Sequence, residues 1–127
     1  AGGNPGVRLE DFSGLAYQVK VFSQSDDYSG ATMTNPTVPV SYKAETHQPV
    51  RVGRHCIVGA GSVITPGVTL GEGTAVGALA LILKSTEAWS IYAGIPAVKI
   101  KDRSRALLAL EPEYLREEAY PPDSKYE

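Results

Sequence analysis

Aliphatic residues recur at every sixth position through the middle of this chain of 127 residues. The positions are Val52, Val58, Ile64, Leu70, Val76 and Ile82. A helical face repeats about every 3.6 residues, so a period of six would rotate around an α-helix. Glycine follows four of the six, and each would cost a helix interior about 1 kcal/mol. A meander of hairpins would keep no fixed phase. The pattern therefore favours neither of these structures.

A six-residue unit fits one side of a triangular coil, with a short strand along the side and a turn at the corner. Three units complete a coil, and successive coils stack as parallel strands about 4.8 Å apart. The sequence thus predicts an all-β fold, a parallel β-helix. In it Val52 lies under Leu70, and Cys56 lies under Thr74 in the narrow interior. Cys56 is accordingly predicted to be a core residue rather than a reactive thiol.

The same phase appears earlier, at Leu9, Leu15 and Val21, but the next aliphatic residue in this phase comes 25 residues late, at Val52. We therefore predict an excursion over about residues 27–51 that leaves the coil and returns in register. Its aspartates, glycine and prolines are typical of a loop. Loops of this length in a regular scaffold are usually functional.

The repeat fades after Ile82, and the sequence Ala-Gly-Ile-Pro-Ala at residues 93–97 predicts a turn that leaves the coil. The charged, leucine-rich stretch at 102–110, continued at 113–118, predicts a short helix that caps the strand edge of the last coil. The expected organisation is a β-helix domain over residues 1–103 and a capping helix with a loose tail over 104–127. Because the first coil begins almost at once, we expect further coils to precede it.

Composition narrows the functional classes. Twelve Lys and Arg residues against 14 Asp and Glu residues give a formal charge of −2, so we expect no nucleic-acid partner. We expect no membrane span, because no apolar run approaches about 18 residues. A single cysteine fits a reducing compartment, and we expect a cytoplasmic protein.

The segment from Val50 to Gly71 and the exit turn at 93–97 resemble the left-handed parallel β-helix acyltransferases, the hexapeptide-repeat family. The resemblance covers about residues 7–103 and is strongest to galactoside, maltose and chloramphenicol O-acetyltransferases. Residues 25–30 and 34–36 are similar to the branch that modifies surface polysaccharides. The resemblance implies a left-handed winding, a homotrimer, and transfer of acetyl from acetyl-CoA to a hydroxyl or amino group of a sugar or nucleotide-sugar acceptor.

The resemblance also implies where coenzyme A would bind. Ala60, Ala78 and Lys84 would line the groove for the thioester and pantetheine, and Lys101 would approach the nucleotide phosphates. Small residues at outward corners let a thin pantetheine arm lie close to the backbone, and a lysine offers a point charge to phosphate. Solvated surface positions are the alternative for both lysines.

The family normally carries a histidine at the start of the loop, where it deprotonates the acceptor. In this chain Asp26 stands there. Three explanations stay open: Asp26 or Asp27 is the base, with a pKa raised by the pair; His47 enters from the far end of the loop; or transfer is weak or lost. His55, at a corner of the coil, is expected to be a surface histidine.

Two other functional classes are possible on this scaffold. A zinc carbonic anhydrase needs three histidine ligands, and the chain has two histidines, so we expect no metal site. A catalytically inactive or truncated β-helix that acts as an assembly module is the non-enzymatic alternative.

Overall fold

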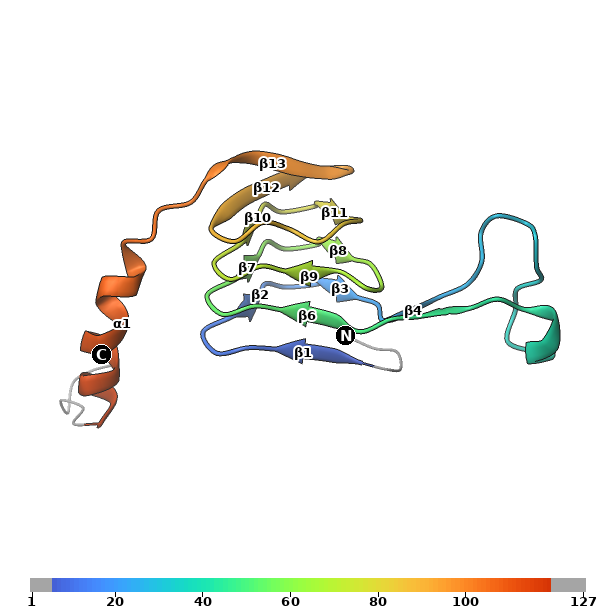
Figure 1. Ribbon diagram of the computed structural model, residues 1–127, viewed down its shortest axis with the longest axis horizontal. Coiled ribbons are helices and arrows are strands. Elements are labelled where there is room, and N and C mark those ends of the chain that lie inside the picture. The colour runs from blue at the N-terminus through green and yellow to red at the C-terminus, as the bar shows by residue number, and fades with distance from the viewer. Residues whose placement is uncertain (1–5, 120–127) are drawn as a thin grey trace.

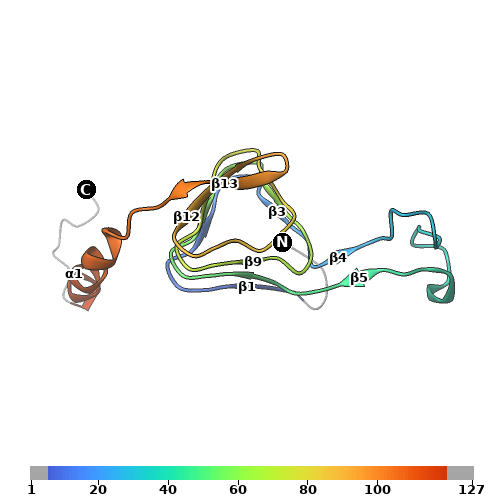
Figure 2. The same cartoon turned by 45° about the horizontal axis from the view of Figure 1, so that its top comes forward.

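A computed structural model describes residues 6–119, and most of them wind into a triangular prism of short stacked strands (Figures 1 and 2). Each side of the prism is one sheet. Sheet A contains β1 (Val7–Leu9), β6 (Val50–Val52) and β9 (Thr69–Leu70). Sheet B contains β2 (Gly14–Leu15), β7 (Ile57–Val58), β10 (Ala75–Val76), β12 (Ser90–Gly94) and β13 (Ala97–Asp102). Sheet C contains β3 (Lys20–Val21), β8 (Val63–Ile64) and β11 (Leu81–Ile82).

The strand register confirms the predicted period. Val52 pairs in parallel with Leu9 on one side and with Leu70 on the other. The same column order holds on the other two sides, where Val58 aligns with Val76 and Ile64 with Ile82. The chain therefore returns in phase after its excursion, as the spacing predicted.

The interior is narrow and fully packed. The inward aliphatic residues of the second coil are 0% exposed, at Val52, Val58 and Ile64. Cys56 is also buried, as predicted; its Sγ donates to the carbonyl of Gly71 at 3.0 Å, and burial raises the pKa of its thiol. Ser62 satisfies its buried hydroxyl by donating to the carbonyl of Gly77 at 2.9 Å. Small side chains at these positions leave room for the opposing aliphatic columns.

The excursion is a two-stranded ribbon that projects from the prism (Figure 2). Strands β4 (Gln24–Ser25) and β5 (Thr46–His47) pair antiparallel, and a 3₁₀ helix η1 (Val40–Tyr42) lies between them. At the base of the ribbon, the backbone amide of Gln48 donates to the carbonyl of Ser23 at 2.9 Å. The predicted bounds of 27–51 are therefore wrong at both ends, because the ribbon starts at 24 and Val50 is already a buried residue of β6.

The C-terminal helix α1 (Leu107–Ala119) runs beside the stack of coils, and Pro112 lies within it (Figure 1). The strand edge of β12 is paired by β13, which runs antiparallel to it. Strand β13, rather than the helix, therefore takes the edge-pairing role that we expected of the helix. The predicted tail at 120–127 lies outside the described residues. No helix in the described part of the chain is long and apolar enough to cross a membrane.

Candidate active site

A groove of about 630 Å³ lies at the base of the ribbon, against strand β8 of sheet C and the residues that follow it. It is lined by Phe22, Gln24, Ser25, Asp26, Tyr28, Val63, Thr65 and Pro66. Asp26 is the only carboxylate in this lining, which it shares with two aromatic rings and several neutral polar groups. Tyr28 is 90% exposed, so its ring is available to a ligand. The groove can therefore offer a hydrogen-bond acceptor beside apolar faces.

The two neighbouring aspartates differ sharply. The carboxylate of Asp27 accepts the Ser29 amide at 2.9 Å and the Thr32 hydroxyl at 2.7 Å. These hydrogen bonds stabilise the ionised form and lower the pKa of Asp27 to about 2. The prediction of a pKa raised by the pair is thus wrong for Asp27, because the hydrogen bonds from Ser29 and Thr32 to its carboxylate outweigh the opposing effect of desolvation. Asp27 is fully ionised at neutral pH and is a poor proton acceptor.

His47 lies on β5, opposite Gln24 across the ribbon, and it is not among the groove residues. Its Nε2 is 3.7 Å from a carboxylate oxygen of Glu45, and the side chain is about half exposed. Glu45 also accepts Gln24 Nε2 at 2.9 Å and pairs with Lys43 at 3.1 Å, which lowers the pKa of Glu45. His47 therefore neighbours a lining residue, Gln24, but does not itself line the groove that holds Asp26.

The four residues expected to hold coenzyme A lie at three places on the prism. Ala60 and Ala78 stack at the corner between sheets B and C, where the Leu79 amide donates to the carbonyl of Ala60 at 2.9 Å. This corner is tight, since a Cβ at Gly59 would lie 2.5 Å from the amide nitrogen of Ala78. Lys101 lies on β13 of sheet B, whereas Lys84 follows β11 at the next corner, between sheets C and A. Both lysines are exposed.

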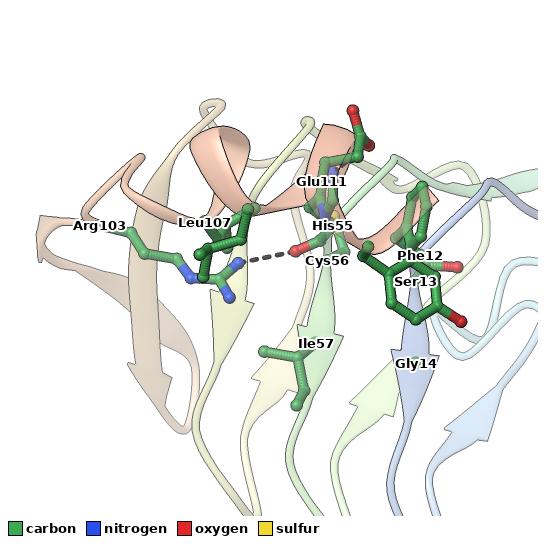
Figure 3. A pocket seen from close by; sticks show the side chains of 11 residues that line it. Phe12, Ser13, Gly14, His55, Cys56, Ile57, Arg103, Leu107 and Glu111 are labelled. Atoms are coloured by element: carbon green, nitrogen blue, oxygen red, sulfur yellow. Dashed lines mark hydrogen bonds and ion pairs between the residues drawn. The ribbon is translucent and has the colours of Figure 1, made fainter. Parts of the chain in front are cut away.

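A second pocket, of about 470 Å³, lies between helix α1 and the corner that joins sheets A and B (Figure 3). It is lined by Phe12, Ser13, Gly14, His55, Cys56, Ile57, Arg103, Leu107, Leu110, Glu111 and Tyr114. None of the residues predicted for catalysis or coenzyme A binding lies in it. Arg103 donates to the backbone carbonyls of His55 at 2.7 Å and Gly73 at 2.9 Å, so its guanidinium is occupied in holding the corner.

The expectation that His55 is a surface residue is wrong. Its side chain is 9% exposed, its ring stacks on Phe12 at 4.9 Å, and its Nε2 is 2.8 Å from Oε1 of Glu111. Arg54 pairs with the same carboxylate oxygen. The sequence could not reveal this burial, because the residue that covers His55 comes from a helix more than 50 positions away. The contacts make His55 an anchor for α1.

Metal chemistry has no obvious ligand set in residues 6–119. No group of three or more His, Cys, Asp and Glu side chains there could hold a metal ion. The two histidines lie apart, one on the ribbon and one under α1.

Comparison with known proteins agrees with the fold and the repeat. Residues 49–84 match the family described as bacterial transferase hexapeptide (six repeats). The dTDP-4-amino-4,6-dideoxy-D-glucose acyltransferase of Escherichia coli is 40% identical over 105 residues, which is 83% of this chain and 55% of the relative. A putative colanic acid biosynthesis acetyltransferase, WcaF of Escherichia coli K12, is 40% identical over 55 residues, or 43% of this chain and 30% of the relative.

Solved structures give the same picture. AntD, an N-acyltransferase from Bacillus cereus in complex with dTDP and 3-hydroxybutyryl-CoA, superposes with a TM-score of 0.89 and 39% identity over 93% of this chain and 63% of that one. A maltose O-acetyltransferase from Clostridium difficile has a TM-score of 0.65 at 24% identity, over 78% of this chain and 49% of that one, and it supports the fold alone.

The chain thus carries the repeat of the hexapeptide transferases, and the predicted family resemblance is confirmed. More particularly, its relatives include an acyltransferase named for a dTDP-linked amino sugar and an N-acyltransferase solved with dTDP and an acyl-CoA. The chain spans about half the length of the E. coli dideoxyglucose acyltransferase.

Proposed function

We propose that this chain forms the β-helix of an enzyme that transfers an acyl group from a CoA thioester to the amino group of a nucleotide-linked amino sugar. A dTDP-4-amino-4,6-dideoxyhexose is the first acceptor to consider. The names of the E. coli relative and of the Bacillus cereus enzyme support this substrate class. The observation that carries the proposal on this chain is the groove whose lining includes Asp26 together with Phe22 and Tyr28.

The groove suits an amino sugar in two ways. The carboxylate of Asp26 can accept an N–H of the sugar amine and so turn the nitrogen lone pair toward the thioester. The rings of Phe22 and Tyr28 can contact the apolar face of a deoxysugar or its pyrimidine base. Ser25 and Thr65 add hydroxyl groups that can fix the orientation of the acceptor.

The exchange of the family histidine for Asp26 favours an amine over a hydroxyl acceptor. A sugar hydroxyl must lose its proton as it attacks, which calls for a base with a pKa near the working pH. A neutral amine already has an available lone pair. It attacks the thioester carbonyl, the C–N bond forms and the C–S bond breaks. The surplus nitrogen proton then passes to the departing thiolate of CoA, whose thiol is expected to resemble cysteine with a pKa of about 8.5.

The proposed contacts for coenzyme A, the acyl donor, are Ala60, Ala78, Lys84 and Lys101. Lys84 lies at a different corner from the two alanines, so one protomer would present the two groups to different neighbours. This placement supports a homotrimer whose grooves are shared between copies, and the family resemblance supports left-handed winding of each β-helix. Acetyl-CoA is the first donor to test, and 3-hydroxybutyryl-CoA is the second. We expect a cytoplasmic enzyme, because an acceptor and donor of this kind fit that compartment.

The deciding experiment mixes the purified protein with acetyl-CoA or 3-hydroxybutyryl-CoA and dTDP-4-amino-4,6-dideoxyglucose. Thiol release and mass spectrometry should report an N-acylated nucleotide sugar. The matched control, dTDP-6-deoxyglucose, carries a hydroxyl where the acceptor carries the amine and should give no product. Transfer to the hydroxyl compound alone would overturn amine specificity. Saturable CoA binding without transfer to any amino or hydroxyl sugar would favour an inactive assembly module.

A further inference from the structure

The turn that follows Asp26 is held by the side chain of its neighbour. Asp27 places one carboxylate oxygen on the Ser29 amide and the other on the Thr32 hydroxyl, at 2.9 Å and 2.7 Å. Both oxygens are thus occupied by donors from the same loop. Asp26 and Tyr28 flank Asp27 in the chain, and both line the groove, whereas Asp27 does not.

The far end of this turn is attached to the returning half of the loop. The Met33 amide donates to the carbonyl of Tyr42 at 2.9 Å, and Met33 forms a bridge with Lys43. The ammonium group of Lys43 in turn contacts Glu45 at 3.1 Å and the carbonyl of Asn35 at 3.2 Å. This side chain is 8% exposed, so the frame on which the turn rests is ordered by buried contacts.

Asp26 and Tyr28 have little else to fix them. Tyr28 is 90% exposed, and Asp26 is an exposed residue. Their positions at the groove therefore follow from the backbone between residues 26 and 32. The two hydrogen bonds of Asp27 span that backbone, beside a shorter-range bond from the Ala31 amide to the Ser29 hydroxyl, and they persist at neutral pH because the pKa of Asp27 is about 2.

We propose that Asp27 is a positioning residue for the acceptor: through Ser29 and Thr32 it holds the turn that presents Asp26 and Tyr28 to the groove. This inference rests on the proposed function, in which the groove binds an amino sugar nucleotide. In this arrangement Asp26 contacts the acceptor, and Asp27 holds the loop. A positioning role predicts weaker acceptor binding with unchanged acyl-CoA binding.

The test uses Thr32→Val, which removes the hydroxyl donor but keeps the shape of the side chain. We expect the KM for dTDP-4-amino-4,6-dideoxyglucose to rise about tenfold, the loss typical of one hydrogen bond to a charged group. The KM for acyl-CoA should stay within twofold. Thr32→Ser restores a hydroxyl and should return the acceptor KM to within twofold of the unchanged protein. Thr34→Val, at an exposed position of the same loop, is the matched control and should change neither constant.

Calorimetric titration with the same nucleotide sugar compares acceptor binding by the unchanged protein and the variants without turnover. If the unchanged protein binds the acceptor but transfers no acyl group, the proposed function fails, while the ratio of Kd values for Thr32→Val and Thr32→Ser still decides the role of Asp27. Equal losses in both KM values, or a lower Tm with unchanged acceptor affinity, would show that the turn is only structural. Absence of acceptor binding in the unchanged protein would overturn both proposals.

Discussion

Gly73 lies against the indole ring of Trp89, so closely that a Cβ at residue 73 would overlap the ring atoms. Gly73 also has a φ of +73°, in the left-handed region that glycine adopts without strain. Trp89 is 4% exposed, and its amide donates to the carbonyl of Glu72 at 2.7 Å. The corner between sheets A and B is therefore closed by one glycine and one aromatic ring.

Gly73→Ala should accordingly destabilise the protein by about 2–4 kcal/mol, since backbone strain adds to overpacking against Trp89. Gly30→Ala is the matched control, because Gly30 also has a positive φ, of +85°, but nothing lies within 4 Å of its added Cβ. It should cost about 1 kcal/mol. Urea unfolding followed by tryptophan fluorescence measures both. Equal losses would mean that the contact with Trp89 contributes nothing.

Val58→Asp should prevent stable folding. Val58 is 0% exposed in a column with Leu15 and Val76, and an unpaired carboxylate there costs several kcal/mol. Thr69→Asp, at an exposed position of β9 beside Arg51, should melt within a few degrees of the unchanged protein. Thermal melts by circular dichroism compare the two. Similar melting of both variants would mean that the assigned inward and outward positions are incorrect.

Asp26→Asn should lower kcat/KM for acyl transfer to the amino sugar by about a hundredfold, within the range for a positioned acid–base group. The substitution keeps the size of the side chain and removes its charge from the groove. Asp11→Asn, at the exposed corner between sheets A and B and outside the groove lining, should have no effect. Steady-state kinetics with both substrates varied provide the measurement. Full activity in Asp26→Asn together with a complete loss in His47→Ala would instead assign proton transfer to His47.

Glu111→Ala should loosen helix α1 from the corner that carries His55. The change removes the carboxylate oxygen that His55 and Arg54 share. We expect a loss of about 1–3 kcal/mol in the free energy that holds the helix in place. Hydrogen exchange measured by mass spectrometry should show faster exchange in α1. Glu113→Ala, an exposed position on the same helix, should not change it; equal acceleration in both would rule out the anchor.

The pKa of Asp27 gives a prediction in pH. Because the folded-state pKa is lowered to about 2, the hydrogen bonds of Asp27 add stability above its ordinary value of 3.8, and this contribution is lost as the pH falls through about 2. An NMR titration of the side-chain carboxyl should show a midpoint near 2. Thr32→Val removes one donor and should raise the midpoint toward 3.8. An ordinary midpoint in the unchanged protein would contradict the hydrogen-bonded turn.

The strict period of six made the coil predictable, because each inward position is set by its distance in sequence from the previous one. Val52 and Leu70 could be paired by counting alone. The start of the ribbon at Gln24 could not, since its pairing with His47 follows no periodic signal.

The candidate site was predictable only in part. Asp26 was found from its place in the loop, and the structure does put it in a groove. The low pKa of Asp27 depends in part on the hydroxyl of Thr32, five residues away. The sequence does not show which of many possible partners that hydroxyl contacts. The burial of His55 depends on Glu111 and on the path of a helix that carries no repeat. Side-chain pairings of this kind arise from packing rather than from pattern.

Strand β13 has a consequence for how molecules meet end to end. A stack of identical parallel coils would present at its top the same backbone pattern that its own bottom accepts, and copies could join head to tail without limit. The antiparallel turn into β13 replaces that pattern with one that a parallel coil does not complement. Lys99 of β13 pairs with Asp102 on the same strand and with Glu87 just before β12, each at 2.9 Å. One reversed strand thus gives this end of sheet B a pattern that the other end of the same sheet does not match.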